Sequence, residues 1–511
     1  KEFDSVQLSL KFNIPVDSNQ NITHCELHPS MMLGLCASVV PFIQNEQAPR
    51  AIFASKQVKQ GVGTYASNYR NRIDTSNHLL HYPNKPLVLG RLHHIFNNDK
   101  MTTGQNVVIA IAQYNGYNAD DAIIGNKTSL DMGLFSSSYF KMYQESEKVD
   151  TKQGITEKFY NPLYKTKENE ANQDDDGVLA DGKQMGRYEE YKHLDKNGFI
   201  KEGTYLKGGE VMIGKSIKYI NNAGIEEERD MSKTVKKDNV NSVVDKVFSC
   251  QTNINGDRLV KVRTCQYRIP EIGDKFASRC AQKGTFGILL DKQDMPYTED
   301  GLIPDMILSP YAYPKRMTMS QFIELLFGNL ASELGIFGLG SPLEPMNPEQ
   351  INDILCDKLG LTNAGDRVLY NGVYGEQMES AIFMGPMYYQ RLKYMVHDKI
   401  NARSSGHRED GIPVPGGAYT ARERQVVSGR ANGGGLRVGE MERDALISHG
   451  VFGFMRERDI VRADKFVVYV SPKNGEIVIG NPQRNIFFDQ LEDGPLSYYL
   501  EEGTEESKKE F

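Results

Sequence analysis

The sequence predicts a mixed α/β fold, and three patterns along the chain indicate this class. Residues 105–114 (QNVVIAIAQY) form a continuous apolar run that ends at the turn-forming pair 115–116, which is typical of a buried strand. Residues 141–270 are polar and contain short alternating stretches and glycine pairs, so β-hairpins with long loops are expected there. Residues 318–330 repeat apolar side chains at helical spacing, which predicts a helix. The apolar face of this helix is expected to contain Phe322, Leu325, Leu326 and Leu330.

Two further helices are expected in the C-terminal part of the chain. Residues 388–403 (YYQRLKYMVHDKINAR) place their apolar side chains on one stripe and their basic side chains elsewhere. Another helix is expected over residues 440–457, after the Gly/Pro-rich loop 404–420 and the arginine-rich sequence that follows it. The end of the chain alternates like short strands and then becomes an acidic tail, which we expect to be disordered.

The composition is that of a folded protein with several domains. The chain has 511 residues, enough for about three or four domains of ~150 residues each. With 39% hydrophobic and 25% charged residues, it can form buried cores. The longest apolar run, 31–43, is shorter than the ~20 residues of a membrane-spanning helix, and no signal peptide opens the chain. Residue 1 is Lys rather than Met, so we expect the sequence to start inside a longer polypeptide.

The cysteines indicate a reducing environment. Six cysteines are scattered along the chain, and the sequence contains no CxxC pair. Single cysteines in a long chain suit an intracellular, reducing compartment, and their spacing excludes the usual structural zinc knuckle. A secreted or membrane protein is therefore not expected.

Basic residues are concentrated in two blocks of an otherwise acidic chain. The formal net charge is −7, which by itself argues against a nucleic-acid partner. Residues 50–100 nevertheless hold eight Lys or Arg against two Asp, and residues 391–437 hold nine against four acidic residues. Such blocks are expected of a protein with one phosphate-facing surface, although solvated surface charge is the alternative for either block alone.

Asp120 and Asp121 form the first candidate site. They belong to the sequence NGYNADD at 115–121, directly after the predicted strand 105–114. Two adjacent carboxylates at a strand end can bind Mg²⁺, with waters and substrate phosphates completing its octahedral shell. Adjacent Asp residues are also common in solvated loops, which is the alternative interpretation of this pair.

The segment 273–284 (GDKFASRCAQKG) carries three cationic side chains between glycines. If the segment is extended, alternation places Lys275, Arg279 and Lys283 on one side. Such a row suits phosphate, because lysine acts as a point charge for it. The sequence lacks the Walker motif GxxxxGK[ST], which disfavours a simple ATPase, and an ordinary basic loop is the alternative.

Two further segments combine arginine with a helix start or with glycine. Arg316 lies in PKRMT at 314–318, just before the predicted helix, where the positive end of the helix dipole also favours an anion. Residues 422–443 are Gly-rich and include Arg430 and Arg437, which suits a loop that orders on a polynucleotide backbone. The alternatives are a cationic surface in the first case and a flexible linker in the second.

Five long motifs occur in a recognisable order. They are GYNADDAI at 116–123, GDKFASRCAQKGT at 273–285, DMPYTEDGLIPDMILSPYAYPKRMT at 294–318, GPMYYQRLKYMVHDKINARSSG at 385–406 and GGLRVGEMERDALISHG at 434–450. Together they resemble the C-terminal half of the second-largest subunit of multisubunit DNA-directed RNA polymerase. Segments at 23–42 and 47–50 extend the resemblance to roughly residues 20–470. The motifs are more similar to the eukaryotic, archaeal and large-DNA-virus branch than to the bacterial one.

The resemblance implies a fold and a domain order. Residues 1–140 and 271–437 would form a hybrid-binding domain on a double-psi β-barrel, with a switch loop in the second part. Residues 141–270 would form a β-rich wall, or flap, insertion. An anchor helix at 438–465 and a small clamp segment at 466–511, ending in the acidic tail, would follow.

The resemblance also implies a role for each candidate residue. Lys275 and Lys283 correspond to lysines near the RNA 3′ end and the incoming nucleotide. Arg50 and Arg316 correspond to arginines that approach the triphosphate. The residues implied to lie along the RNA, the template strand or the hybrid are Lys59, Gln60, Lys399, Arg403, Arg430 and Arg437.

Magnesium is the implied cofactor, shared with another polypeptide. Asp121 corresponds to a carboxylate that helps hold the second, nucleotide-borne Mg²⁺, and Asp120 stands where the family usually has Glu. The sequence has no DxDxD cluster for the first metal, which the resemblance assigns to the largest subunit. The chain would therefore catalyse nucleotidyl transfer from NTPs to the RNA 3′ end only together with that subunit.

Other implied partners are alpha-like assembly subunits, the missing N-terminal half of the second-largest subunit, the DNA template and the RNA–DNA hybrid. No membrane partner is expected. The compartment would be the nucleus or the cytoplasm, or a viral factory or virion if the protein is viral.

The chain departs from the family pattern in ways that point to a viral or otherwise divergent polymerase. Cys280 and Ala281 replace the usual His and Gly, and the clamp segment has none of the four zinc-binding cysteines of cellular relatives, so no zinc is expected in this chain. Two alternatives to the polymerase function stay open. One is a noncatalytic nucleic-acid-binding assembly module that retains the fold, and the other is a subunit of an RNA-templated polymerase.

Overall fold

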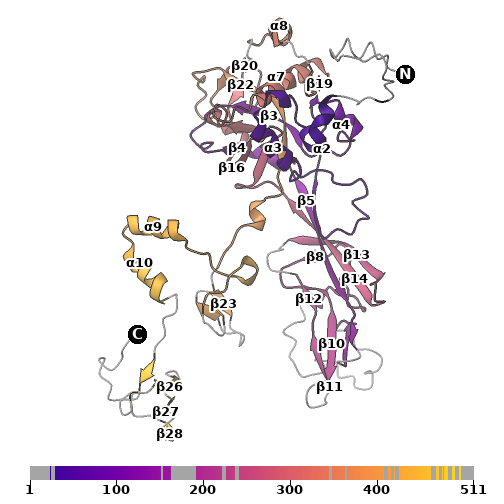
Figure 1. Cartoon of the computed structure of the whole chain (residues 1–511), viewed down its shortest axis with the longest axis vertical. Helices are drawn as coiled ribbons and strands as arrows, with labels where there is room; N and C mark the ends of the chain where they lie inside the picture. The colour runs from indigo at the N-terminus through magenta and orange to yellow at the C-terminus, as the bar shows by residue number, and fades with distance from the viewer. Residues whose placement is uncertain are drawn as a thin grey trace, which may run out of the picture. The chain divides into compact units, whose positions relative to one another are not determined.

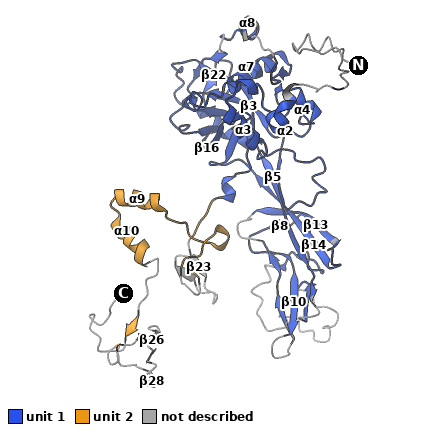
Figure 2. Cartoon of the chain, in the orientation of Figure 1, with its two compact units in different colours: residues 1–399 blue, residues 400–511 orange. Residues whose placement is uncertain are grey.

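The structure, a computed structural model, divides into two compact units, residues 1–399 and residues 400–511 (Figure 2). It describes residues 24, 29–150, 154–162, 191–220, 226–235, 241–344, 348–362, 365–403, 405–407, 413–415, 419–420, 425–461, 468–470, 475, 477–481, 486–489 and 494–495. The predicted disorder of the acidic tail concerns residues outside this set.

Six strands of the first unit close into a β-barrel. In hydrogen-bonded order they are β15 (Lys275–Ser278), β16 (Lys283–Leu290), β4 (Ala122–Asn126), β18 (Met306–Leu308), β3 (Gln105–Ile111) and β22 (Ile382–Arg391). Strands β3, β4, β16 and β22 of this barrel are labelled in Figure 1. Because β22 also pairs with β15, the sheet has no free edge at this point. The β16–β4 and β18–β3 pairs are parallel and the other four are antiparallel. The mixed α/β fold with a barrel, and the buried strand within 105–114, are confirmed.

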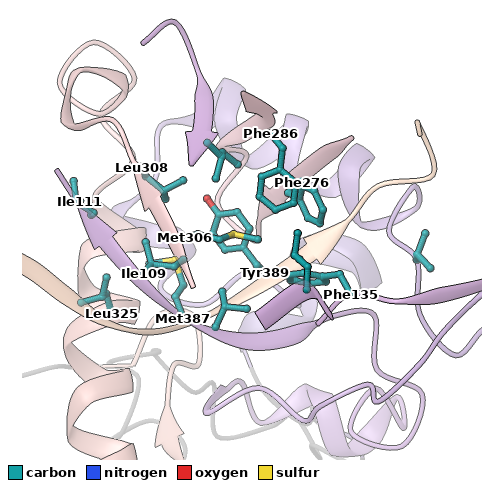
Figure 3. Close-up of a cluster of buried hydrophobic side chains, with 14 of the residues drawn as sticks. Ile109, Ile111, Phe135, Phe276, Phe286, Met306, Leu308, Leu325, Met387 and Tyr389 are labelled. Carbon is teal, nitrogen blue, oxygen red and sulfur yellow. The ribbon is translucent and has the colours of Figure 1, made fainter. Parts of the chain in front are cut away.

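The barrel interior is filled by large apolar side chains (Figure 3). Phe276, Phe286, Met306, Met387 and Tyr389 are each at most 2% exposed. Strand alternation explains this arrangement, because successive side chains point to opposite faces of the sheet. Burying one such side chain stabilises the fold by about 1.5–3 kcal/mol, so this cluster fixes the positions of the strand ends.

Helix α7 (Met319–Leu334) packs on β22 and confirms the helix predicted at 318–330. Its buried face is more polar than the sequence pattern predicted. Leu325 is buried as expected, but Phe322, Leu326 and Leu330 are only half-buried. The buried side chains are mainly Ser320, Gln321, Glu324, Leu325, Asn329 and Ala331. The helix comes so close to the strand that a Cβ at Gly328 would meet the Pro386 carbonyl oxygen at 2.1 Å.

The first unit also contains short elements outside the barrel. The helices are η1 (Pro29–Leu33), α2 (Gly34–Ala37), η2 (Ile43–Asn45), α3 (Ala48–Val58), α4 (Leu92–Ile95), α5 (Lys127–Asp131), η4 (Lys292–Asp294), η5 (Pro310–Ala312) and α8 (Pro348–Leu359). The strands are β2 (Val88–Leu89) paired with β19 (Gly338–Leu339), β17 (Tyr297–Thr298) paired with β21 (Leu369–Tyr370), and β20 (Asp366–Arg367) on β22.

The region predicted to form β-hairpins is built of β-sheets around a core of its own, and one of these sheets also includes β1 (Ser76–Leu80) from outside the region. This sheet has the order β1, β5 (Ser137–Ser146), β14 (Arg258–Arg268), β13 (Ser242–Thr252) and β8 (Tyr205–Leu206). Another has the order β11 (Glu226–Asp230), β10 (Lys215–Ile220), β7 (Ile155–Phe159) and β6 (Val149–Asp150), and β12 (Lys233–Thr234) pairs with β9 (Val211–Ile213). Buried side chains between Tyr143 and Val262 form the core, so hairpin formation here is confirmed within the described residues.

The helix predicted over residues 388–403 is wrong. Residues up to Arg391 belong to strand β22, and a short 3-10 helix, η6 (Val396–Asp398), follows. The strand lies between β3 and β15 in the closed barrel, so its side chains on both faces are buried. A strand that is buried on both sides lacks the alternation that identifies one, and its apolar residues happened to match helical spacing.

The second unit consists of short elements. They are β23 (Ser405–His407), β24 (Pro413–Pro415), η7 (Arg430–Asn432), α9 (Glu440–Ser448), α10 (Phe452–Arg456), the π-helix η8 (Glu457–Val461), β25 (Tyr469–Val470), β26 (Ile477–Asn481), β27 (Ile486–Asp489) and β28 (Gly494–Pro495). The single helix predicted at 440–457 is interrupted, because Gly450 has a φ of 69° and ends the helical path. None of the helices in the described parts of either unit is long and apolar enough to cross a membrane.

Candidate functional site

Cationic side chains from three separate segments of the chain line one pocket of about 280 Å³. Arg50 comes from helix α3, Lys275 from β15 and Lys283 from β16. Gln60, just after α3, lines the same pocket. Three predicted phosphate contacts therefore lie together, although Arg50 precedes the two lysines by more than two hundred residues in the sequence.

The register of the β15–β16 pair brings the two lysines to one face. Lys275 lies opposite Thr285, and Ala277 lies opposite Lys283, so both lysine side chains leave the same side of the pair. The intervening Phe276 points to the other side and is buried in the barrel. The expected common side of Lys275 and Lys283 is confirmed.

Arg279 does not join this row, and its predicted placement is wrong. The chain turns after Ser278, whose amide donates to the Gln282 carbonyl at 3.0 Å, so the alternation does not continue. Arg279 is 1% exposed and its Nη2 donates to Glu324 Oε1 at 2.5 Å. Its Nη1 donates to the Val88 carbonyl at 2.9 Å. Arg279 therefore stabilises the fold beneath α7 and does not face a ligand.

Arg316 forms hydrogen bonds with Asp121 and with Gln282, the residue before Lys283. Its Nη2 donates to Asp121 Oδ2 at 2.6 Å, and its Nη1 donates to Gln282 Oε1 at 2.7 Å. Asp121 and Gln282 also line a second, smaller cavity together with Lys283. Asp120 and Asp121 have φ values of 51° and 69°, a left-handed backbone that is costly for residues other than glycine. The Asp121 carboxylate, the Arg316 guanidinium and Lys283 therefore lie within one small region.

Comparison with known proteins identifies the family of this chain. Residues 36–410 match the family described as RNA polymerase Rpb2, domain 6, and residues 434–492 match RNA polymerase Rpb2, domain 7. The chain belongs to the family of second-largest RNA polymerase subunits.

Relatives from eukaryotes and archaea agree with this assignment. The chain is 37% identical over 474 residues to DNA-directed RNA polymerase II subunit RPB2 of Encephalitozoon cuniculi, covering 92% of this chain and 39% of that protein. It is 39% identical over 476 residues to DNA-directed RNA polymerase II subunit 2 of Arabidopsis thaliana, covering 92% and 37%. It is 38% identical over 471 residues to DNA-directed RNA polymerase subunit Rpo2 of Sulfolobus acidocaldarius, covering 91% and 39%. The chain spans about two fifths of the length of these curated relatives.

Several residues at the site were not predicted from the sequence. Lys56 and Tyr394 line the pocket, and Gln282 holds Arg316 in place. Helical spacing could have indicated the face of α3 that lines the pocket. Residues on this face recur at intervals of three or four, namely Arg50, Phe53, Gln57 and Gln60. Lys59, by contrast, is exposed at the end of α3, outside this row.

The predicted nucleic-acid contacts belong to both units. Lys399, at the end of the first unit, has its Nζ 5.0 Å from the centroid of the Tyr394 ring. Arg403, Arg430 and Arg437 belong to the second unit. There, Arg403 donates to the Gly433 carbonyl at 2.9 Å, Arg430 begins η7, and Arg437 is exposed.

The carboxylates fit part of a magnesium site. Within the described residues, no group of three His, Cys, Asp or Glu side chains could hold a metal ion by itself. Magnesium is often held by only one or two protein carboxylates, with phosphates and waters as the other ligands. Asp121, anchored by Arg316, and its exposed neighbour Asp120 match such an incomplete ligand set.

Glu46, just before α3, has a carboxyl group whose pKa lies near neutral pH. Burial raises the pKa of its carboxyl from 4.5 to about 7, although a hydrogen bond from Ser320 and the nearby Arg50 oppose this shift. Its Oε1 is buried without a hydrogen-bond partner in the described part of the chain. The carboxyl is therefore more stable in the protonated form near neutral pH than an exposed one.

We expect the stability of the chain to decrease as the pH rises from about 4.5 to about 7 through the titration of Glu46. In this window the folded state binds the proton more tightly than the unfolded state, so deprotonation favours unfolding. Urea midpoints measured at pH 5 and pH 8 should differ less in Glu46→Gln than in the parent, because the amide does not titrate. An equal pH dependence in both proteins would contradict this assignment.

Proposed function

We propose that this chain acts as the C-terminal part of the second-largest subunit of a DNA-directed RNA polymerase. In this role it contributes to nucleotidyl transfer from NTPs to the RNA 3′ end. The observation that carries the proposal is the convergence of Arg50, Lys275 and Lys283 on one pocket. Asp121 lines a second cavity together with Lys283 and is paired with Arg316. Family membership supports the same role.

The chemistry of phosphoryl transfer explains why these side chains are gathered. Charge develops on the triphosphate in the transition state, and fixed cations that face this charge lower the barrier. Lys275 and Lys283 supply ammonium groups on one face of the β15–β16 pair. Arg50 supplies a guanidinium group from helix α3, which lines the same pocket. When bound, Mg²⁺ would neutralise the phosphates further, and Asp121 with Asp120 would provide part of its ligands.

The remaining parts of the active enzyme would come from other chains. The largest subunit would supply the carboxylate cluster for the first Mg²⁺, and alpha-like subunits and the N-terminal half of the second-largest subunit would complete the assembly. Template DNA and the RNA–DNA hybrid would run along Lys59, Gln60, Lys399, Arg403, Arg430 and Arg437. The domain boundaries at 140, 270, 437 and 465, the compartment and a viral source stay predictions.

The Lys283→Ala variant of the assembled polymerase tests the proposal. We expect the rate of single-nucleotide addition to fall by about 10²-fold, as for other preorganised groups that face developing charge. Lys292→Ala is the matched control, because Lys292 is an exposed lysine in η4, beyond the end of the same strand. An elongation rate equal to that of the parent would refute the role of Lys283.

The same assay separates the alternatives. If Lys283→Ala weakens binding to an RNA–DNA scaffold but the parent complex adds no nucleotide, the noncatalytic assembly module is favoured. If the parent complex extends RNA on an RNA template in preference to a DNA template, the RNA-templated polymerase is favoured.

A further inference from the structure

Tyr394 is surrounded by lysines at the edge of the pocket. The Nζ atoms of Lys399, Lys393 and Lys275 lie 5.0, 5.6 and 6.0 Å from the centroid of its ring. These distances are within the range in which an ammonium group is attracted by the ring quadrupole. The ring is 37% exposed and lines the pocket together with Lys275 and Lys283.

The backbone on both sides of Tyr394 is held in place. The bonds that fix it are those from the Leu392 amide to the Lys275 carbonyl (2.9 Å), from the Lys393 amide to the Gln60 carbonyl (2.9 Å), from the Val396 amide to Asp274 Oδ1 (2.9 Å), and from Arg268 to Asp398 (2.7 Å). The backbone that carries the ring is therefore fixed, whereas the lysines around it have long, flexible stems.

An aromatic ring holds a lysine in a different way from a carboxylate. A carboxylate neutralises the ammonium charge, whereas a ring attracts it and leaves its net charge in place. Within the described part of the chain, none of Lys275, Lys393 and Lys399 forms an ion pair with a carboxylate. No carboxylate of the described residues therefore competes with a phosphate for these three ammonium groups.

We propose that Tyr394 is a positioning residue that gathers Lys275, Lys393 and Lys399 into a preformed site for the phosphates of the nucleotide and the nucleic-acid backbone. This proposal rests on the proposed function, because it names a group that orders the cations of the same pocket. The ring reduces the number of conformations that the lysines must give up when a phosphate binds.

The test compares Tyr394→Leu and Tyr394→Phe in the assembled polymerase. Two or three weak cation–π contacts correspond to about a fivefold change, so Tyr394→Leu should raise the KM for NTP by about fivefold and change kcat by less than about twofold. Tyr394→Phe keeps the ring quadrupole and should stay within about twofold of the parent KM. Tyr374→Leu, which removes an exposed tyrosine in the loop after β21, is the control and should leave the KM unchanged.

A second measurement distinguishes this proposal from the proposed function. Lys275→Met should raise the KM whether or not the ring matters. If Lys275→Met is impaired and Tyr394→Leu behaves like the parent, the positioning role is refuted and the proposed function survives. A Tyr394→Phe variant as impaired as Tyr394→Leu would also refute the ring as the cause. If Lys275→Met and Lys283→Ala both behave like the parent, the proposed function itself fails.

Discussion

Replacing Glu324 with alanine should lower the free energy of unfolding of the first unit by about 3–5 kcal/mol, because the change leaves a buried charge without its partner. The side chains of Arg279 and Glu324 are 0% and 1% exposed, and they form a direct ion pair. Glu324 also accepts from the Tyr388 amide. Removing the carboxylate therefore leaves the guanidinium charge without its counter-charge, and a strand amide without this acceptor, far from water.

Urea unfolding followed by circular dichroism measures this effect. Glu333→Ala is the control on the same helix, since Glu333 is half exposed and pairs with Arg367 only at 3.8 Å. Its loss should change the stability by less than about 0.5 kcal/mol. The double variant Arg279→Met/Glu324→Leu should recover much of the stability, because it removes both buried charges. A Glu324→Ala midpoint equal to that of the parent would contradict the assignment.

The buried Arg279–Glu324 pair also helps to position Lys283. Arg279 lies inside the turn that connects β15 to β16, four residues before Lys283. Anchoring Arg279 to α7 fixes the path of the turn and therefore the start of β16. A loss of this anchor should affect the site as well as the stability, although Arg279 does not contact the pocket.

The parts of the structure that depend on local pattern could be predicted from the sequence. The strand at 105–111 and the helix at 319–334 have strong apolar signals. Lys275 and Lys283 share a side as predicted, but through the register of the β15–β16 hairpin and not through unbroken alternation. The strand ending at Arg391 has the apolar spacing of a helix, because burial on both faces removes the alternation that identifies a strand. Local pattern also could not show that Arg279 turns inward.

Contacts between distant segments could not be predicted from local sequence patterns. The Asp121–Arg316 pair joins residues 195 positions apart, and it depends on where β4 begins in the closed barrel and where η5 ends. The resemblance to the polymerase family identified both residues, but not their mutual contact. The grouping of Lys275, Lys393 and Lys399 around Tyr394 was also not predicted, because the segment that carries Tyr394 was expected to be a helix.

Arg316→Ala should reduce the kcat of nucleotide addition by the assembled polymerase by roughly 10²-fold, the scale for removing one preorganised donor at a site of developing charge. The guanidinium bridges Asp121 and Gln282, so it both holds the carboxylate and adds positive charge next to Lys283. Lysine cannot replace it fully, because one ammonium group lacks the planar fork that reaches both partners.

Single-turnover kinetics of Arg316→Ala, Arg316→Lys and the neighbouring control Lys315→Ala measure the contribution of this side chain. We expect Arg316→Lys to lie between Arg316→Ala and the parent, and Lys315→Ala to match the parent, because Lys315 is exposed. A double-mutant cycle with Asp121→Asn should show strong non-additivity, since the two residues share one interaction. If Arg316→Ala adds nucleotides at the parent rate, Arg316 serves only to hold the loop. The cationic half of the site would then consist of Arg50, Lys275 and Lys283.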